Sequence, residues 1–312
     1  MTDIRMIALD LDGTTLTRGC ITSRTRRALE AAIEQGVSVV IATGRVYGAL
    51  PKDVFRIRGL QYILTSNGAV ITDLSQKTVI YENCISRDAV MQILSLLYQN
   101  PHVRVVALTD GQAYVDADVF EELKNHGPAA SCMSRSYIMR TTTAIDGILE
   151  FMGKRVHRLE NISLHFTDDG EKERIRQELK KIDGITLTSS MAHNLEIGGA
   201  NTSKASGLLA LSQLTGIGLD EIMACGDSPN DMAMLSESGF SVVMSNGAPE
   251  VLELADFVAP SNEEEGVAYV VERFVLGMER PAWQLTLLTG KNRILNQCRR
   301  AARKLLHWKG RR

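Results

Sequence analysis

Six short apolar runs, each ended by a polar or glycine-rich turn, are the feature that most limits the fold of this chain. The runs are almost continuously apolar, which is typical of strands buried on both faces of a parallel sheet. Helical patterns follow several of them, as at 22–35, where Gly36 marks the helix end. The runs are Ile4–Leu9, Val37–Ala42, Tyr62–Leu64, Glu221–Cys225, Phe240–Met244 and Phe257–Ala259. Strands alternating with helices predict an α/β fold, a parallel sheet covered by helices on both faces.

The middle of the chain has a different pattern. A helix at 87–100 precedes two strands, 103–108 and 112–117, which a hairpin signal at Thr109-Asp110-Gly111 joins. After a less regular part the order repeats, with a strand at 162–166, a helix at 169–182 and strands at 185–189 and 194–198. This pattern predicts a second α+β module with antiparallel pairing, inserted into the parallel domain from about Ser86.

Composition limits the class of protein. The chain has 312 residues and is 44% hydrophobic, enough for one large domain or two moderate ones. No stretch approaches the length of a membrane span, and the N-terminus lacks the apolar region of a signal peptide. The five cysteines have no CxxC spacing, which favours reduced thiols and a cytoplasmic location.

The net charge of −2 is unevenly distributed. Ten of the 35 Lys and Arg follow Glu279 and no acid does, so residues 1–279 hold 25 bases against 37 acids. This acidic body argues against nucleic-acid binding. A basic amphipathic helix at 291–308 would fit an anionic membrane or a nucleic acid. We favour the alternative that it docks on the acidic body or on another subunit.

The first apolar run ends in two carboxylates. Asp10 and Asp12 follow Leu9, one residue apart, and Gly13 comes next. By itself an Asp-Gly pair after a strand is most simply a turn. However, ligands of open α/β sheets bind beyond the carboxyl ends of the strands, and further polar groups occur near other predicted strand ends and helix starts. These are Thr43-Gly44-Arg45, Lys204, and Asp227 with Asn230 and Asp231.

Together these groups predict phosphate chemistry. Asp10, Asp12 and Asp227 would form the hard oxygen site that Mg²⁺ prefers. Thr43 and Lys204 would then face a phosphate that the metal neutralises. One carboxylate can attack phosphorus to give an aspartyl phosphate, and the other can act as acid and then as base.

These motifs resemble the haloacid dehalogenase (HAD) superfamily, in particular its Cof-type phosphatases. The resemblance spans about residues 4–275 and rests on Asp10-Leu11-Asp12-Gly13-Thr14, Thr43-Gly44-Arg45, Ser66-Asn67-Gly68-Ala69, Lys204 and Gly226-Asp227-Ser228-Pro229-Asn230-Asp231. It implies a Rossmann-like, HAD-like parallel-sheet core with an inserted α+β cap. The expected division is a core of residues 1–85 and 191–276, a cap of residues 86–190 and a basic C-terminal extension of residues 277–312, expected to be helical.

The resemblance also implies roles for the site residues. Asp10 would be the nucleophile and Asp12 the general acid/base, while Lys204 would offset charge on the nucleophile and the phosphate. The side chains of Asp10 and Asp227 and the main-chain carbonyl of Asp12 would hold Mg²⁺. Thr43, Gly44 and Asn230 would bind the phosphate, and Asn67 would contact the substrate. Asp231 would orient Lys204. For Arg45 two roles are open, a substrate contact or an outward salt bridge.

The implied function is a Mg²⁺-dependent phosphatase that hydrolyses small phosphorylated metabolites, such as sugar phosphates, through an aspartyl phosphate. The cap should set the substrate, with candidates in 109–135 and 190–200, including His193 and Glu196. We expect a monomer or small homo-oligomer. Two alternatives remain: a phosphomutase with the same covalent chemistry, and a non-catalytic regulatory or binding protein that acts through the basic tail.

Overall fold

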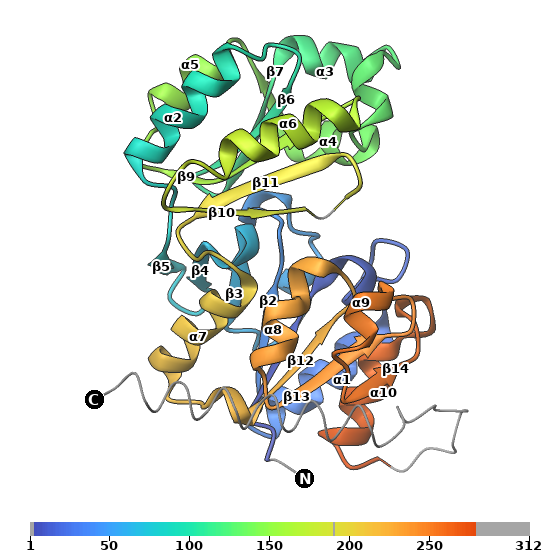
Figure 1. Ribbon diagram of the computed structural model, residues 1–312. Coiled ribbons are helices and arrows are strands. Elements are labelled where there is room, and N and C mark those ends of the chain that lie inside the picture. The colour runs from blue at the N-terminus through green and yellow to red at the C-terminus, as the bar shows by residue number, and fades with distance from the viewer. Residues whose placement is uncertain (1–2, 190, 279–312) are drawn as a thin grey trace.

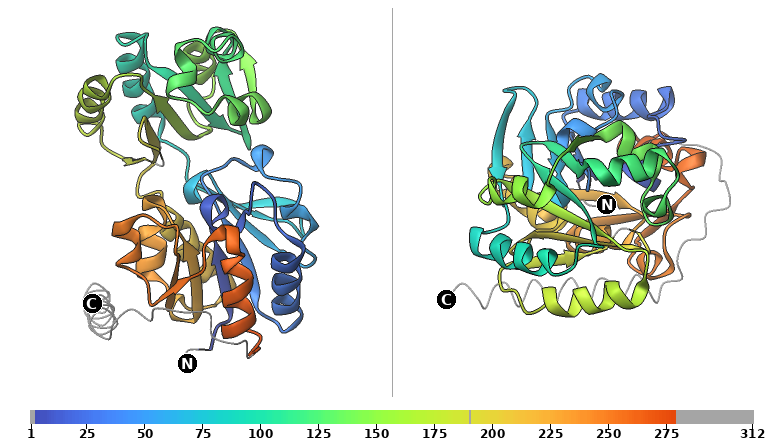
Figure 2. Two further views of the ribbon diagram at one scale, coloured as in Figure 1. Left: turned by 90° about the vertical axis from the view of Figure 1, so that its right-hand side faces the viewer. Right: turned by 90° about the horizontal axis from the view of Figure 1, so that it is seen from above.

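The computed structural model describes residues 3–189 and 191–278. The expected helix in the basic tail therefore lies outside the described residues. The rest of the chain forms two stacked units, a core and a cap (Figure 1). A view turned by 90° about the vertical axis shows the same stacking of the cap on the core (Figure 2).

The core is built on an eight-stranded sheet with the order β14-β13-β12-β1-β2-β3-β4-β5. All pairs from β14 to β3 are parallel, as the continuous apolar runs predict. The strands are β1 Met6–Leu9, β2 Ser38–Ala42, β3 Tyr62–Thr65, β4 Val70–Asp73, β5 Thr78–Glu82, β12 Ile222–Gly226, β13 Phe240–Met244 and β14 Phe257–Ala259. The antiparallel strands β4 and β5, which the sequence analysis did not predict, extend this sheet at one edge.

Helices cover both faces of the core sheet. Alternate residues of β1 show the division, because Ile7 and Leu9 pack in one apolar cluster while Met6 and Ala8 pack in another. The first cluster includes residues of α1 (Ser23–Glu34) and α10 (Gly266–Phe274). The second includes residues of α7 (Lys204–Thr215), α8 (Met232–Glu237) and α9 (Pro249–Leu252). The core is therefore a three-layer α/β/α unit.

The cap contains a six-stranded, mostly antiparallel sheet with the order β10-β11-β9-β6-β7-β8. Its strands are β6 Arg104–Thr109, β7 Gln112–Asp116, β8 Thr142–Ile145, β9 Leu159–His165, β10 Ile185–Thr188 and β11 Asn194–Gly199. Its helices are α2 Arg87–Tyr98, α3 Ala117–Lys124, α4 Arg135–Thr141, α5 Ile148–Gly153 and α6 Asp169–Leu179. The predicted hairpin is confirmed, with Asp110 and Gly111 both at positive φ between β6 and β7.

The cap sheet extends beyond residue 190, where the sequence analysis placed its boundary. Strand β11 pairs with β9 on one side and with β10 on the other, so residues 194–199 belong to this sheet. The chain returns to the core only at Ser203, which caps the start of α7. The sequence pattern showed this strand but could not show its partners.

No helix in residues 3–189 and 191–278 is long and apolar enough to cross a membrane. The four cysteines in these ranges are free thiols, as expected. The fifth, Cys298, lies outside the described residues.

Candidate active site

Four neighbouring strands bring the predicted site residues to one edge of the core sheet. Strands β12, β1, β2 and β3 lie side by side and run in the same direction, so their carboxyl ends meet. Asp227, Asp10, Thr43 and Asn67 follow these four strands within two residues. Residues up to 217 positions apart are thereby brought together at the place where α/β sheets bind ligands.

Lys204 lies at the centre of the acidic groups. It is the first residue of α7, after the capping residue Ser203, and its side chain is fully buried. Nζ donates to Asp10 Oδ1 at 2.6 Å and to Asp231 Oδ1 at 2.7 Å. Burial alone would lower the pKa of Lys204, but the two adjacent carboxylates outweigh burial and raise it. Lys204 is therefore a charged ammonium group beneath Asp10.

Asp231 supports this arrangement from below. Its side chain is fully buried, and its second oxygen, Oδ2, accepts hydrogen bonds from the backbone N–H groups of Asp227 and Ser228 at 3.1 and 3.0 Å. One carboxylate thus orients both Lys204 and the loop that carries Asp227. This geometry matches the orienting role that the resemblance implies for Asp231.

Asp10 has one carboxylate oxygen that no described protein group contacts. Oδ1 is bonded to Lys204, while Oδ2 is buried and has no hydrogen-bond partner among the described residues. Orphaned buried oxygens are rare in folded proteins, because they lose hydration without compensation. The pattern indicates that Oδ2 is reserved for a ligand or a reaction.

Asp227 is placed next to Asp10 by the turn Leu11–Thr15. Thr14 Oγ1 donates to Asp227 Oδ1 at 2.6 Å. Gly13 has a φ of +80°, and a Cβ at this position would lie 2.3 Å from Asp227 Oδ2.

Partial burial raises the pKa of Asp227 to about 6, and the Thr14 hydrogen bond only partly opposes this. Carboxylate oxygens of Asp10, Asp227 and Asp231 lie within 4.8 Å of one another, close enough to share a cation.

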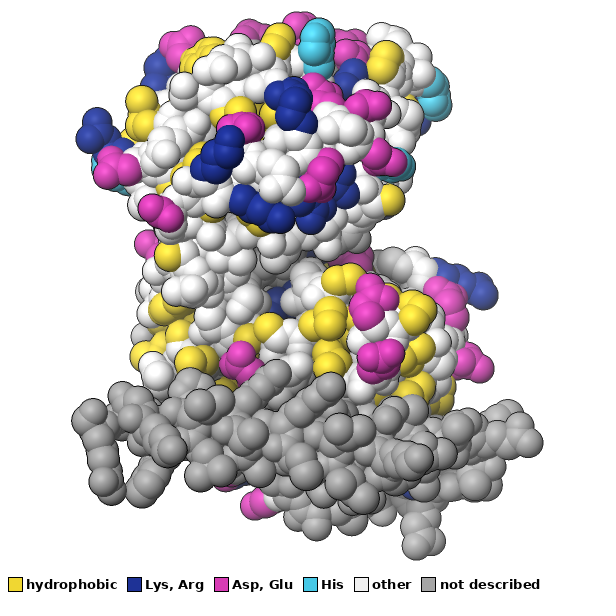
Figure 3. Space-filling view, in the orientation of Figure 1, with side chains coloured by type: hydrophobic (Ala, Val, Ile, Leu, Met, Phe, Trp, Pro, Cys, Tyr) yellow, Lys and Arg dark blue, Asp and Glu magenta, His cyan; other side chains and the backbone are white. Residues whose placement is uncertain are grey.

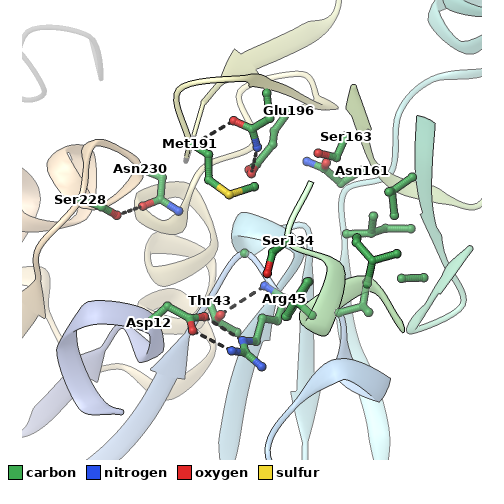
Figure 4. Close-up of a pocket in the computed structure, with 18 of the residues that line it drawn as sticks. Asp12, Thr43, Arg45, Ser134, Asn161, Ser163, Met191, Glu196, Ser228 and Asn230 are labelled. Carbon is green, nitrogen blue, oxygen red and sulfur yellow. Dashed lines mark hydrogen bonds and ion pairs between the residues drawn. The ribbon is translucent and has the colours of Figure 1, made fainter. Parts of the chain in front are cut away.

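Asp12 lies on the open side of the same turn. Its side chain is 58% exposed and forms an ion pair with Arg45, which follows β2. Arg45 is therefore turned toward the site and is not an outward salt bridge. Arg45 also lies over the ring of Tyr137 of α4, with its guanidinium carbon 5.0 Å from the ring centroid. Core and cap thus meet at this arginine (Figure 4).

A second polar link joins core and cap at Asn67. Its Nδ2 donates to Glu196 Oε2 of β11 at 2.6 Å, and its Oδ1 accepts from Asn230 Nδ2 at 3.1 Å. Glu196 also accepts from Asn194 on the same strand. The predicted cap candidate Glu196 therefore contacts the site. His193 does not line the cavity; its side chain is half exposed and lies beside Asp169.

These groups surround a cavity of about 500 Å³ between core and cap. Figure 3 shows the surface hollowed where the two units meet. Of the ten predicted site residues, Lys204, Asp231 and Asn67 lie beneath the cavity wall and contact residues that line it. The other seven, Asp10, Asp12, Thr43, Gly44, Arg45, Asp227 and Asn230, line the cavity directly.

Comparison with known proteins identifies the family. The family model described as haloacid dehalogenase-like hydrolase matches residues 7–271, which is most of the chain and includes all ten predicted site residues. The chain belongs to the haloacid dehalogenase-like hydrolase family. The resemblance seen in the motifs is thereby confirmed.

Curated relatives in this family are named phosphatases. The 5-amino-6-(5-phospho-D-ribitylamino)uracil phosphatase YwtE of Bacillus subtilis is 29% identical over 297 residues, which cover 88% of this chain and 99% of the relative. The Escherichia coli phosphatase YbjI, named for the same substrate, is 28% identical over 285 residues, covering 89% and 98%. This chain is accordingly a phosphatase of the haloacid dehalogenase family.

Solved structures confirm the predicted fold class. A haloacid dehalogenase-like hydrolase from B. subtilis matches with a TM-score of 0.72 and 26% identity, covering 87% of this chain and all of the other. One from Bacteroides thetaiotaomicron also gives 0.72 and 26% identity, covering 86% and 99%. The HAD-like α/β core with an inserted α+β cap is therefore the fold of this chain.

Sequence reasoning missed most of the cap side of the cavity. Asn161, Ser163 and His165 of β9 line it, as does Tyr137 of α4, yet all four lie outside the predicted segments. A signal was present for three of them, because Asn161, Ser163 and His165 alternate with Ile162 and Leu164. Period-two alternation predicts one polar and one apolar face of a strand. For Tyr137 we find no sequence signal.

Proposed function

We propose that this chain is a Mg²⁺-dependent phosphatase that hydrolyses small phosphorylated metabolites, such as sugar phosphates, through an aspartyl phosphate on Asp10. The proposal rests on the family, on the relatives named as phosphatases and on the geometry around Asp10. One observation supports it most directly: Asp10 holds Lys204 with one oxygen and leaves the other unpaired beside the cavity. A carboxylate arranged in this way is oriented to act as a nucleophile.

In the first half of the reaction, Asp10 Oδ2 attacks phosphorus. The new bond from oxygen to phosphorus forms the aspartyl phosphate, and the bond from phosphorus to the leaving-group oxygen breaks. Asp12 gives a proton to that oxygen, so the product leaves as an alcohol. Lys204 remains bonded to Asp10 Oδ1 and offsets negative charge at the phosphoryl group.

In the second half, Asp12 acts as a base. It takes a proton from a water molecule, whose oxygen attacks phosphorus, and the bond from Asp10 to phosphorus breaks. Phosphate leaves and the Asp10 carboxylate is restored. In both steps the phosphoryl group would be held by Thr43 and the backbone of Gly44, with Asn230 nearby and Asn67 placed by its hydrogen bond to Asn230.

The donor set fits a divalent cation. The carboxylates of Asp10 and Asp227 converge at the cavity, with ligand oxygens within 4.8 Å of each other, and carboxylate oxygens are the donors that Mg²⁺ prefers. Both oxygens of Asp231 are already used by Lys204 and the loop backbone. Asp10, Asp227 and the main-chain carbonyl of Asp12 would therefore hold Mg²⁺, whose charge offsets that of the phosphoryl group and the carboxylates.

The first test is phosphate release from a panel of phosphate esters, with Mg²⁺ and with EDTA. The panel contains sugar phosphates, nucleotides and the ribitylaminouracil phosphate for which two relatives are named. We expect release that needs Mg²⁺ and is lost in Asp10→Asn. Asp53→Asn is the matched control, since Asp53 pairs with Arg56 on the surface. Transfer of phosphate between two hydroxyls without release would instead support a phosphomutase.

A second test examines the covalent step. Acetyl phosphate has a leaving group that needs no proton, so Asp12→Asn should still be phosphorylated by it but should lose the phosphate slowly. Intact-mass spectrometry should then show one added phosphoryl group in Asp12→Asn and none in Asp10→Asn. An added phosphoryl group that persists in Asp10→Asn would contradict the assignment of the nucleophile.

A further inference from the structure

One face of the cap sheet bounds the cavity, and we call this face the roof. Strand β9 shows which side chains the roof carries. Along β9, Ile162 and Leu164 face away and pack in the apolar cluster under the cap helices. Asn161, Ser163 and His165 point the other way and line the cavity. In an antiparallel sheet one face commonly packs on the apolar core while the other faces solvent and is polar. The polar face of β9 is therefore the face that a molecule in the cavity would meet.

Strand register divides the roof into two unlike halves. Ser163 lies opposite Glu196 of β11 on one side and opposite Val106 of β6 on the other. Asn161 likewise lies opposite Leu108 of β6. Polar side chains thus line β9 and β11, which we call the polar half. Aliphatic side chains line the adjacent strands β6 and β7, which we call the apolar half; those reaching the cavity are Val106, Leu108 and Ala113.

Asn161 is the observation that points to a ligand. Its side chain lines the cavity, the residue is only 3% exposed, and the amide has no hydrogen-bond partner among the described residues. In Figure 4 the amide of Asn161 and the hydroxyl of Ser163 lie at the cavity. The amide atoms are open to the cavity rather than enclosed by protein, so a donor and an acceptor are both offered there. A bound molecule would supply the missing partner.

The charges around the cavity limit what that molecule can carry. Among the described residues, Arg45 is the one Lys or Arg that lines the cavity, and Asp12 already holds its guanidinium. His165 is neutral near pH 7, because burial lowers its pKa to about 4. Glu196 adds a carboxylate to the polar half. An anionic group at the roof would therefore meet no compensating charge.

We propose that the roof selects an uncharged leaving group. This group forms hydrogen bonds on one side under Asn161 and Ser163, and on the other side it places the face of an uncharged ring against Val106 and Leu108. This inference rests on the proposed phosphatase function and names its substrate class. A phosphorylated hydroxyl-bearing chain or sugar joined to a neutral ring fits both halves. Bisphosphates and phosphorylated acids fit neither.

Two matched pairs of phosphate esters test the substrate class. Glucose 6-phosphate and 6-phosphogluconate are similar in size but differ by a carboxylate. Ribose 5-phosphate and uridine 5′-monophosphate share a phosphorylated ribose but differ by a neutral ring. We expect kcat/KM to favour glucose 6-phosphate and uridine 5′-monophosphate, each by at least about tenfold. Equal or greater activity on 6-phosphogluconate would overturn the charge argument.

Substitutions test the two halves separately. Asn161→Leu preserves side-chain volume but removes the amide, and Val106→Thr places a hydroxyl in the apolar half. Each is measured as the kcat/KM ratio of uridine 5′-monophosphate to acetyl phosphate, whose leaving group is too short to reach the roof. The ratio should fall about tenfold in Asn161→Leu, because one hydrogen bond is lost. It should also fall in Val106→Thr, and it should stay unchanged in the control Asn125→Leu, an exposed cap residue.

The outcomes separate this inference from the proposed function. If acetyl phosphate and every ester fail to react, the phosphatase proposal fails. The roof is then tested by binding alone, as a rise in melting temperature caused by uridine in the wild type but not in Asn161→Leu. If the esters react but the ratio does not change in Asn161→Leu, the phosphatase proposal stands and the inference about the roof is wrong.

Discussion

Arg45 holds both carboxylate oxygens of Asp12. Its Nε donates to Oδ2 at 2.7 Å and its Nη2 donates to Oδ1 at 2.6 Å. Its Nη1 donates to the carbonyl of Ala49 at 3.1 Å, which fixes the plane of the guanidinium. The proposed acid/base is therefore oriented by an arginine that also lies against the cap residue Tyr137. More than half of the Asp12 side chain stays exposed beside the cavity.

Arg45→Lys should lower kcat/KM by roughly 10- to 100-fold, because lysine keeps the charge but cannot make the two parallel hydrogen bonds. Steady-state kinetics with a sugar phosphate would measure this. Arg56→Lys is the matched control, since Arg56 forms an exposed ion pair with Asp53. Equal activity of Arg45→Lys and wild type would show that the paired geometry at Asp12 is not needed.

Gly13→Ala should abolish activity by displacing Asp227. The new Cβ would lie 2.3 Å from Asp227 Oδ2, and the φ of +80° adds strain of about 1 kcal/mol. Gly19→Ala has the same φ of +80° but meets nothing within 4 Å. Both variants should lose similar stability to backbone strain, but only Gly13→Ala should lose Mg²⁺-dependent phosphate release. Comparable activity of the two variants would contradict the role of this close approach.

Lys204→Met should destabilise the fold by about 3 to 5 kcal/mol as well as remove activity. The substitution leaves the carboxylates of Asp10 and Asp231 buried without their shared cation. Denaturant unfolding of the two proteins measures the difference. Lys124→Met removes a surface ion pair with Glu121 and should change stability little. A Lys204→Met variant as stable as wild type would show that these carboxylates are not both ionised.

His165 should make stability depend on pH. Burial lowers its pKa to about 4 from the usual 6.5, so the unfolded chain binds the proton more readily than the folded one. The stability that neutral His165 contributes is complete above pH 6.5 and is lost as pH falls toward 4. Between pH 7.5 and 4.5, wild type should lose roughly 2 to 3 kcal/mol more than His165→Gln.

Urea unfolding at several pH values measures this loss. His126→Gln is the control, because His126 is exposed and its removal should leave the pH dependence of wild type intact. Parallel curves for wild type and His165→Gln would mean that His165 does not titrate differently in the folded and unfolded states.

Local patterns in the sequence predicted the core well. The runs that become β13 and β14 were predicted with the bounds that the structure has, and the helix predicted at 22–35 is α1 within one residue at each end. Such strands are buried on both faces, so their apolar character does not depend on which neighbours they have. The ten predicted site residues line one cavity or contact residues that do, because parallel strands expose their carboxyl ends at one edge.

The partners of individual strands could not be read from the sequence. The pairing of β11 with β9, and the addition of β4 and β5 to the core sheet, depend on contacts between residues far apart in the chain. The same holds for the ion pair between Arg45 and Asp12, two residues 33 positions apart that only the fold brings together.

The sequence by itself determined the family, the fold class and the residues at the carboxyl ends of the core strands. Their signals are local, since each motif lies within a few residues of the strand or helix that positions it. Only the tertiary structure decided which cap side chains face the cavity, because that depends on how one sheet is laid over another. Asn161 and Leu108 line the same cavity because β9 pairs with β6 in a register that places these two residues opposite each other.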